Sequence, residues 1–228
     1  LDAAFARVSG TEAAFWRNDG DGNFTPLAEG PEPGDVNAAV LADVDGDGDL
    51  DAWLARDGGD EVWLNAGDGT FDDSEQSLGA SGARGLALGD LDRDGDLDAF
   101  AARAGADTVW LNALSHRNAA FPTSENVELG FQSGVSLSAA DVDGDGDVDL
   151  VGASRADDRV TWWKNEGYSN GGLAWTRREI ATVYRGAHAV WPADMDRDGD
   201  TDILTAAHDA SEVSWFENTD GGGTTWTQ

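Results

Sequence analysis

The chain has 228 residues, of which 40% are hydrophobic, and it carries ten Trp, no Cys and a formal net charge of −31. So much apolar content excludes a disordered acidic tail, and so negative a charge excludes nucleic acid as a partner. Without Cys the chain has no disulfide, thiolate metal site or cysteine nucleophile, and no apolar run is long enough for membrane insertion.

The first predicted element is a β-hairpin at residues 13–24, AAFWRNDGDGNF, which matches VWLNAGDGTF at 62–71. In both stretches an apolar strand ends on Asn, and a Gly-rich turn of the hairpin type follows. We expect the third and fourth strands of a repeat here. Leu1 and Asp2 match the last two residues of an acidic motif that recurs downstream, so the first repeat is expected to be incomplete, with at most a remnant of a binding loop at Asp2.

A nine-residue acidic motif occurs four times after this hairpin. Its copies begin 47, 51 and 53 residues apart, which is a blade-sized period for a propeller-type array. Adjacent carboxylates repel one another, and crowding raises some of their pKa values unless a cation compensates. The copies are DVDGDGDLD (43–51), DLDRDGDLD (90–98), DVDGDGDVD (141–149) and DMDRDGDTD (194–202).

Short strand-like runs surround each motif. A small-residue apolar run precedes it, a second apolar run follows it, a third run ends on Asn about ten residues later, and a weaker fourth run comes last. No stretch has helical periodicity, so we predict an all-β chain, a single β-propeller of four-stranded antiparallel blades with about five repeats, the first incomplete. The expected repeats are approximately 1–30, 31–80, 81–128, 129–182 and 183–228 of the one domain at 1–228.

The spacing D-x-D-x-D-G-x-x-D within the motif predicts a calcium loop. Side chains at positions 1, 3 and 5 of a tight loop converge, the carbonyl of position 7 faces the same point, and the carboxylate of position 9 closes the shell. Gly at position 6 permits the bend. An EF-hand would need Glu at position 12, where this chain has Leu54, Ala101, Gly152 and Thr205, and flanking helices. Oxygen ligands in this number favour Ca²⁺ over Mg²⁺, zinc or copper.

The stretch DVDGDGDLDAWLA, followed by DEVWLNAGDGTF, resembles the FG-GAP/VCBS repeat family, as does RGAHAVWPADMDRDGDTDIL with SEVSWFEN. The resemblance implies a calcium-loop β-propeller, as in integrin α-subunits, in which each loop joins the first and second strands of a blade. It implies four Ca²⁺ ions, with main-chain carbonyls of Asp49, Asp96, Asp147 and Asp200 among the ligands. The side-chain ligands carried over are Asp43, Asp45, Asp47 and Asp51; Asp90, Asp92, Asp94 and Asp98; Asp141, Asp143, Asp145 and Asp149; and Asp194, Asp196, Asp198 and Asp202.

Aromatic and histidine residues offer weaker candidates. Recurring third-strand Trp residues predict packing between blades rather than a sugar-stacking ladder. His188 and His208 belong to one repeat, and with Tyr184 and Arg185 they could form a polar cluster of the kind that a polysaccharide lyase uses. A structural role for each of these residues is the alternative, because no nucleophile or base motif accompanies them. The Trp residues assigned to one equivalent position are Trp16, Trp63, Trp110, Trp162 and Trp215.

Three functional classes fit these features: an extracellular or cell-surface binding and adhesion module for a glycan or protein, a secreted lyase-like enzyme, and a structural spacer in a larger surface protein. The lack of a catalytic motif favours the binding module or the structural spacer over the enzyme. Asp-built loops suit the millimolar calcium found outside cells. Because neither end of the chain carries a spare inner strand, we expect the 228 residues either to be part of a larger propeller or to close only by association with another chain or fragment.

Overall fold

The computed structural model describes residues 3–5, 14–26, 36–76, 78–79, 83–103, 107–113, 119–127, 135–169 and 172–228. These ranges contain nineteen strands in five sheets and no helix, and therefore no helix that could cross a membrane. The all-β prediction is confirmed over this part of the chain. Asp2, the expected remnant of a loop, lies outside the described residues.

Three antiparallel sheets form the first part of the chain. The first has three strands, β1 (Ala3–Phe5), β2 (Ala14–Asn18) and β3 (Phe24–Pro26). The second has four, β4 (Val36–Ala42), β5 (Asp51–Arg56), β6 (Gly59–Asn65) and β7 (Phe71–Asp73). The third consists of β8 (Gly85–Gly89), β9 (Asp98–Ala102), β10 (Asp107–Leu111) and β11 (Thr123–Val127).

Two further four-stranded antiparallel sheets complete the described structure. The fourth sheet consists of β12 (Val135–Ala140), β13 (Asp149–Ser154), β14 (Arg159–Ser169) and β15 (Gly172–Ala181). The fifth consists of β16 (Ala187–Ala193), β17 (Asp202–Ala207), β18 (Glu212–Asn218) and β19 (Trp226–Thr227). In every four-stranded sheet the strands pair in chain order, as the repeat pattern predicts.

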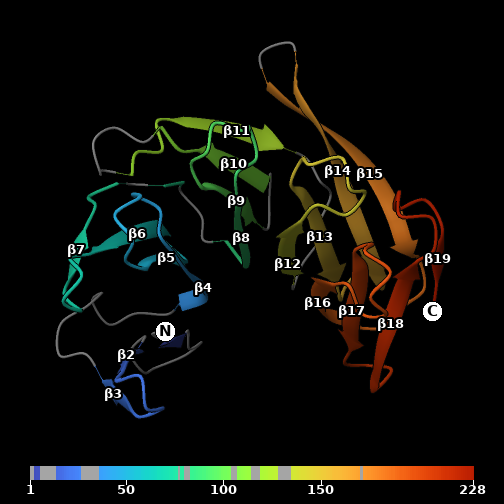
Figure 1. Ribbon diagram of the computed structural model, residues 1–228, viewed down its shortest axis with the longest axis horizontal. Helices are drawn as coiled ribbons and strands as arrows, with labels where there is room; N and C mark the ends of the chain where they lie inside the picture. The colour runs from blue at the N-terminus through green and yellow to red at the C-terminus, as the bar shows by residue number, and fades with distance from the viewer. Residues whose placement is uncertain are drawn as a thin grey trace.

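The five sheets stand side by side in an open arc (Figure 1). The first strands of successive sheets, β4, β8, β12 and β16, contact one another along the inner side of the arc, and the fourth strands lie on its outer side. The described sheets do not close into a ring. The structure therefore has the sheets and the repeat order expected of propeller blades, and ring closure stays a prediction.

Hydrophobic cores fill the spaces between successive sheets. Trp53 of the second sheet packs with Leu86 of the third sheet and with Phe121, which precedes β11, and Phe100 of the third sheet packs with Leu150 of the fourth. Second strands lie between two such layers, so their side chains are buried on both faces; all five residues of β9 and all six of β13 are buried. This explains why the second runs of the repeats are apolar throughout rather than alternating.

The strand register corrects one prediction about the Trp residues. Trp63 and Trp110 lie two residues before the Asn that ends the third strand, whereas Trp162 and Trp215 lie three residues before it. Trp162 pairs with Val151, and its equivalents by register are Val62 and Val109 rather than Trp63 and Trp110. The residues equivalent to Trp63 are instead Trp16, Trp110, Trp163 and Phe216. The predicted packing role holds for both sets, because Trp162 and Trp163 are buried in different cores.

Candidate metal centres

The four acidic motifs connect first and second strands, and their ninth residue is the first residue of the second strand. We call them loops 1 to 4, at residues 43–51, 90–98, 141–149 and 194–202. In each loop the carboxylate at position 1 accepts a hydrogen bond from the N–H of the Gly at position 6. That Gly has a φ between 89° and 99°, which supports the reason given for its presence. Position 4 is also left-handed, and Arg93 and Arg197 adopt a positive φ there.

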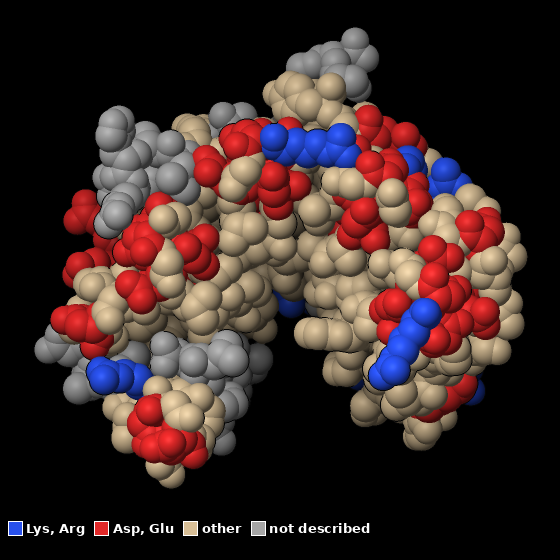
Figure 2. All heavy atoms as spheres, in the orientation of Figure 1, with Lys and Arg blue, Asp and Glu red and all other residues tan. Residues whose placement is uncertain are grey.

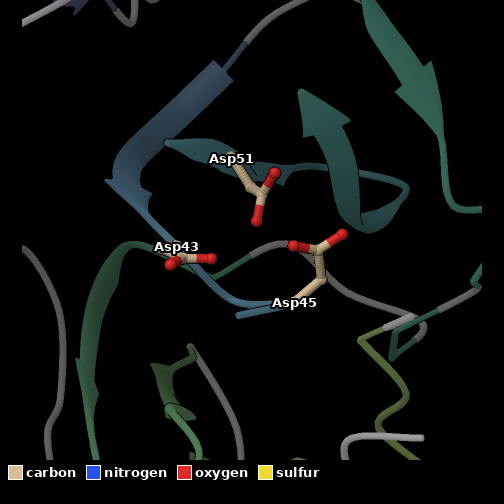
Figure 3. Close-up of side chains that lie close together, drawn as sticks. All are labelled: Asp43, Asp45 and Asp51. Atoms are coloured by element: carbon tan, nitrogen blue, oxygen red, sulfur yellow. The ribbon is translucent and has the colours of Figure 1, made fainter. Parts of the chain in front are cut away.

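Three carboxylates converge in every loop. In loop 1 one oxygen of each of Asp43, Asp45 and Asp51 lies within 4.8 Å of the others, and the three side chains point toward one another (Figure 3). Positions 1, 3 and 9 form the same group in loops 3 and 4, whereas positions 1, 3 and 5 form it in loop 2. The corresponding groups are Asp90, Asp92 and Asp94; Asp141, Asp143 and Asp149; and Asp194, Asp196 and Asp202.

The aspartate at position 9 also anchors its loop to the sheet. One oxygen of Asp51 accepts the N–H of Val44 at 2.8 Å, and the other accepts the N–H of Asn65 at 2.8 Å. The same pair of bonds recurs at Asp98, Asp149 and Asp202. Burial raises the pKa of Asp51 to about 6 and the pKa values of Asp98 and Asp149 to about 7, because these carboxylates have lost water, and at Asp149 the positive charge of Lys164 offsets this only in part.

The remaining predicted aspartates lie around these groups. At position 5, Asp94 joins the group of its loop, whereas Asp47, Asp145 and Asp198 do not. At position 7 the side chain turns toward the hairpin that follows the third strand, where Gly67 and Gly221 leave room for the carboxylates of Asp49 and Asp200. The side chains at position 7 therefore stay outside the three-carboxylate groups; Asp96 and Asp147 are likewise absent from them.

Two buried carboxylate oxygens show that the loops fit a cation. Asp90 Oδ1 and Asp143 Oδ1 are buried and receive no hydrogen bond from any described residue. Burial is also the main cause that raises the pKa values of Asp45 and Asp92, with repulsion from neighbouring aspartates adding to it. Buried oxygen acceptors without donors, grouped in threes, are the ligand set that a hard divalent cation such as Ca²⁺ compensates.

Sequence reasoning missed one residue of each site, the Asn that ends the third strand. Its side-chain N–H₂ donates to the position 8 carbonyl of its own loop and, in three of the four sites, to the position 2 carbonyl of the preceding loop. Asn112 bonds Leu97 and Val44 in this way, at 3.2 and 2.9 Å. The signal was present in the sequence, because Asn recurs at this position in every repeat. The other members are Asn65, for which only the bond to its own loop is described, Asn165 and Asn218.

The predicted histidine cluster forms only in part. The rings of His188 and His208 are 6.2 Å apart, and His208 Nδ1 lies 2.7 Å from Asp209. Tyr184 is instead buried in the core between the fourth and fifth sheets, where it packs on Phe216 and its hydroxyl donates to the Thr205 carbonyl at 3.4 Å. The four residues therefore do not form the single polar set that a lyase would need.

A cavity of about 770 Å³ opens beside loop 1, between the second sheet and residues 119–122 of the third repeat. Gln76 fixes this segment, since it donates to the Ala119 carbonyl and accepts the Phe121 N–H, both at 2.9 Å. Ser74 Oγ is buried here without a hydrogen-bond partner among the described residues. Acidic side chains gather in several patches on the viewed face of the arc (Figure 2). Other lining residues are Asp45, Asp47, Leu64, Asp72, Asp73 and Pro122.

The acidic loops belong to a sequence repeat that is known from a protein family. The model described as "FG-GAP-like repeat" matches residues 1–54, 43–101, 90–152 and 141–205. Three of the four matches begin at position 1 of an acidic loop, so the family pattern is built on the same motif. No curated protein sequence matches the chain.

Among solved structures, a lectin from Agrocybe aegerita has a similar fold. Its structure is described as explaining specific recognition of non-reducing terminal N-acetylglucosamine. The TM-score is 0.62 and the sequence identity 22%, over 95% of this chain and 59% of the lectin chain. The chain thus spans less than two thirds of the length of this neighbour, and the likeness is one of fold.

Proposed function

Because the chain belongs to the FG-GAP-like repeat family, we propose that it is a calcium-binding module, part of a β-propeller, that recognises a glycan outside the cell. The observation that carries the metal part is the set of four groups of three carboxylates, in which Asp90 Oδ1 and Asp143 Oδ1 are buried and receive no hydrogen bond from a described residue. The ligands would be the aspartates at positions 1, 3, 5 and 9 with the carbonyls at position 7. A bound Ca²⁺ would supply the countercharge that lets these carboxylates stay ionised.

This arrangement predicts that the four loops need calcium to stay ordered. Without a cation, five carboxylates per loop repel one another on connections that hold first and second strands together. Extracellular modules bind calcium with dissociation constants of about 10⁻⁴–10⁻³ M. An exposed loop that offers a few carboxylates can reach this affinity. An extracellular location follows from this requirement as part of the proposal.

The cavity beside loop 1 is the proposed glycan site. Its volume lies within the range of about 300–1,000 Å³ that is usual for small-ligand sites. Carboxylates of Asp72 and Asp73 can accept hydrogen bonds from sugar hydroxyls, and Phe121 and Pro122 offer apolar surface. The Ser74 hydroxyl has no hydrogen-bond partner among the described residues. The lectin's recognition of terminal N-acetylglucosamine supports a glycan as the ligand class.

A calcium titration tests the metal part. Calorimetry on metal-stripped protein should detect up to four Ca²⁺ ions, and Asp45→Asn should remove one of them, because position 3 contributes to the group in loop 1. Asp68→Asn, which removes an exposed carboxylate in a hairpin turn, is the matched control and should leave the count unchanged. Detection of no calcium at millimolar concentration would overturn this part.

A glycan array tests the ligand. Binding to a glycan class should be detected in millimolar calcium, and Ser74→Ala should weaken it without a change in melting temperature. Thr227→Ala, at the far end of the arc, is the control and should bind as the unaltered protein does. An array without binding, or equal binding by Ser74→Ala, would contradict the glycan site while leaving the calcium result intact.

A further inference from the structure

The residue just before the third-strand Asn faces the acidic loop of its own repeat. Leu64, which precedes Asn65, lines the same cavity as Asp45 and Asp47, positions 3 and 5 of loop 1. The register of the third strand against the second is the same in each four-stranded sheet, so this position recurs beside every loop. Its occupants are Leu64, Leu111, Lys164 and Glu217.

Loop 3 has a cation at this position. Lys164, the only lysine of the chain, donates hydrogen bonds through its ammonium to the carboxylates of Asp143 and Asp145. These are again positions 3 and 5, so Lys164 stands over loop 3 as Leu64 stands over loop 1. The Lys164 side chain is only 15% exposed, so water screens its contact with loop 3 weakly.

A second basic side chain reaches the same loop from the preceding repeat. Arg93, at position 4 of loop 2, forms an ion pair with Asp147 and donates to the Asp145 carbonyl at 3.2 Å. Among the described residues, no basic side chain forms an ion pair with positions 1, 3 or 5 of loops 1, 2 and 4. Among the described residues, loop 3 is therefore the loop whose proposed ligand carboxylates form ion pairs with a basic side chain of the chain itself.

We propose that Lys164 is a resident counter-ion of loop 3, which holds this loop in shape without metal and makes it the weakest of the four calcium sites. The inference rests on the proposed calcium binding of the loops. A cation that enters loop 3 must either displace the ammonium from Asp143 and Asp145 or bind beside it, and both cost Coulomb energy. In loop 1 the same position holds an uncharged Leu, so a metal ion meets no such competitor.

The electrostatics of the loops agree with this difference. The hydrogen bond from Lys164 lowers the pKa of Asp145, the aspartate at position 5 of loop 3. Burial raises the pKa values of Asp45 and Asp92, which belong to loops 1 and 2. Lys164 compensates the charge of loop 3 only in part, because burial still raises the pKa of Asp149, position 9 of this loop, to about 7.

Exchange of the two residues tests the proposal in both directions. Lys164→Leu gives loop 3 the residue of the second and third repeats, and Leu64→Lys gives loop 1 the ammonium. Arg159→Leu is the matched control, because it removes a positive charge from the same strand but its partner is Glu179, outside the loops. Calcium binding is measured by calorimetry on metal-stripped protein, and the melting temperature is measured with and without calcium.

We expect Lys164→Leu to tighten the weakest calcium site about tenfold or more, and Leu64→Lys to weaken one of the tight sites to a similar extent. Without metal, Lys164→Leu should melt below the unaltered protein, and saturating calcium should remove that difference. Arg159→Leu should leave the calcium titration unchanged. Leu64→Lys keeps the test decisive if Lys164→Leu does not fold.

The outcomes separate this inference from the proposed function. If the unaltered protein binds calcium but both exchanges leave every affinity unchanged, Lys164 is no counter-ion of the site and the inference is wrong. If the unaltered protein binds no calcium at all, the proposed function is wrong and the inference is wrong with it. A melting temperature of metal-free Lys164→Leu equal to that of the unaltered protein would also contradict the structural role.

Discussion

The side-chain N–H₂ of Asn112 donates a hydrogen bond of 2.9 Å to the carbonyl of Val44, 68 residues earlier in the chain. Val44 is position 2 of loop 1, and the backbone N–H of Asn112 donates to Asp98, position 9 of loop 2. One Asn therefore joins two successive acidic loops. Asn165 and Asn218 make the same connection to Leu91 and Val142, so loops 1 to 4 form a connected series.

Replacement of this Asn should destabilise the protein. Asn112→Ala removes the donor to the carbonyls of Val44 and Leu97 and the acceptor of the Ala120 N–H. A buried group left without its partner costs about 1–3 kcal/mol, so we expect the free energy of unfolding in urea to fall by at least that much. A second effect should be weaker calcium binding at both loop 1 and loop 2.

Asn37→Ala is the control for this prediction. The Asn37 side chain donates only to the exposed Asp57 carboxylate, at 3.0 Å, so its loss should change the free energy of unfolding by no more than about 0.5 kcal/mol. Equal effects of the two substitutions would show that the connection between loops contributes nothing to stability.

The sequence was sufficient for the parts of the fold that repeat. Strand order, the place of the acidic motif between first and second strands, and the left-handed Gly at position 6 all follow from patterns within one repeat. The equivalence assigned to Trp162 and Trp215 is wrong, because it was based on the aromatic content of the third strand. The distance of each Trp from the Asn at the end of that strand identifies the equivalent positions. A shift of one residue moves a side chain to the other face of a sheet.

Features between repeats could not be predicted in the same way. The bond from Asn112 to Val44 depends on how one sheet is placed against the next, and no pattern within a repeat contains that information. Lys164 could be read only as one basic residue on a strand, since its contact with Asp143 and Asp145 depends on the bend of loop 3. Closure of the array likewise depends on the angle between sheets and stays a prediction, as does a further chain that completes it.

Metal-free protein should become less stable as the pH rises from about 4 to above 7. Burial raises the pKa of Asp51 from 3.8 to about 6 and that of Asp98 to about 7. A carboxyl whose pKa is higher in the folded state contributes stability below its unfolded pKa, and that contribution is lost as the pH rises through the folded value. Melting temperatures of metal-stripped protein should therefore be higher at pH 5 than at pH 8.

Calcium should oppose this dependence, because it binds the ionised carboxylates. The increase in melting temperature on addition of calcium should thus be larger at pH 8 than at pH 5. Asp98→Asn, which cannot ionise, should flatten the profile of the metal-free protein between pH 5 and 8. A metal-free melting temperature that rises over this range would contradict the burial of these carboxylates.

Removal of calcium should lower the melting temperature strongly at neutral pH. At a calcium concentration of a hundred times the dissociation constant, each independent site adds about 2.7 kcal/mol to the free energy of unfolding. Magnesium at the same concentration is the control, and it should protect less because it requires a strict octahedral set of ligands. Melting curves that coincide in calcium and in chelator would refute the proposal that the loops bind calcium.

A buried ion pair between the second and third sheets should be among the most sensitive contacts outside the loops. Arg103, just after β9, pairs with Asp60 of β6, and their side chains are 5% and 0% exposed. Asp60→Leu leaves the Arg103 guanidinium buried without this partner, and loss of one member of a buried pair costs about 3–5 kcal/mol. Arg155→Ala breaks an exposed pair with Asp209 and should cost about 0–1 kcal/mol.

A double variant separates charge from packing. Asp60→Leu combined with Arg103→Met removes both charges, so its free energy of unfolding should recover most of the loss. If the double variant is as unstable as Asp60→Leu alone, the loss comes from packing around Asp60 rather than from the broken ion pair with Arg103.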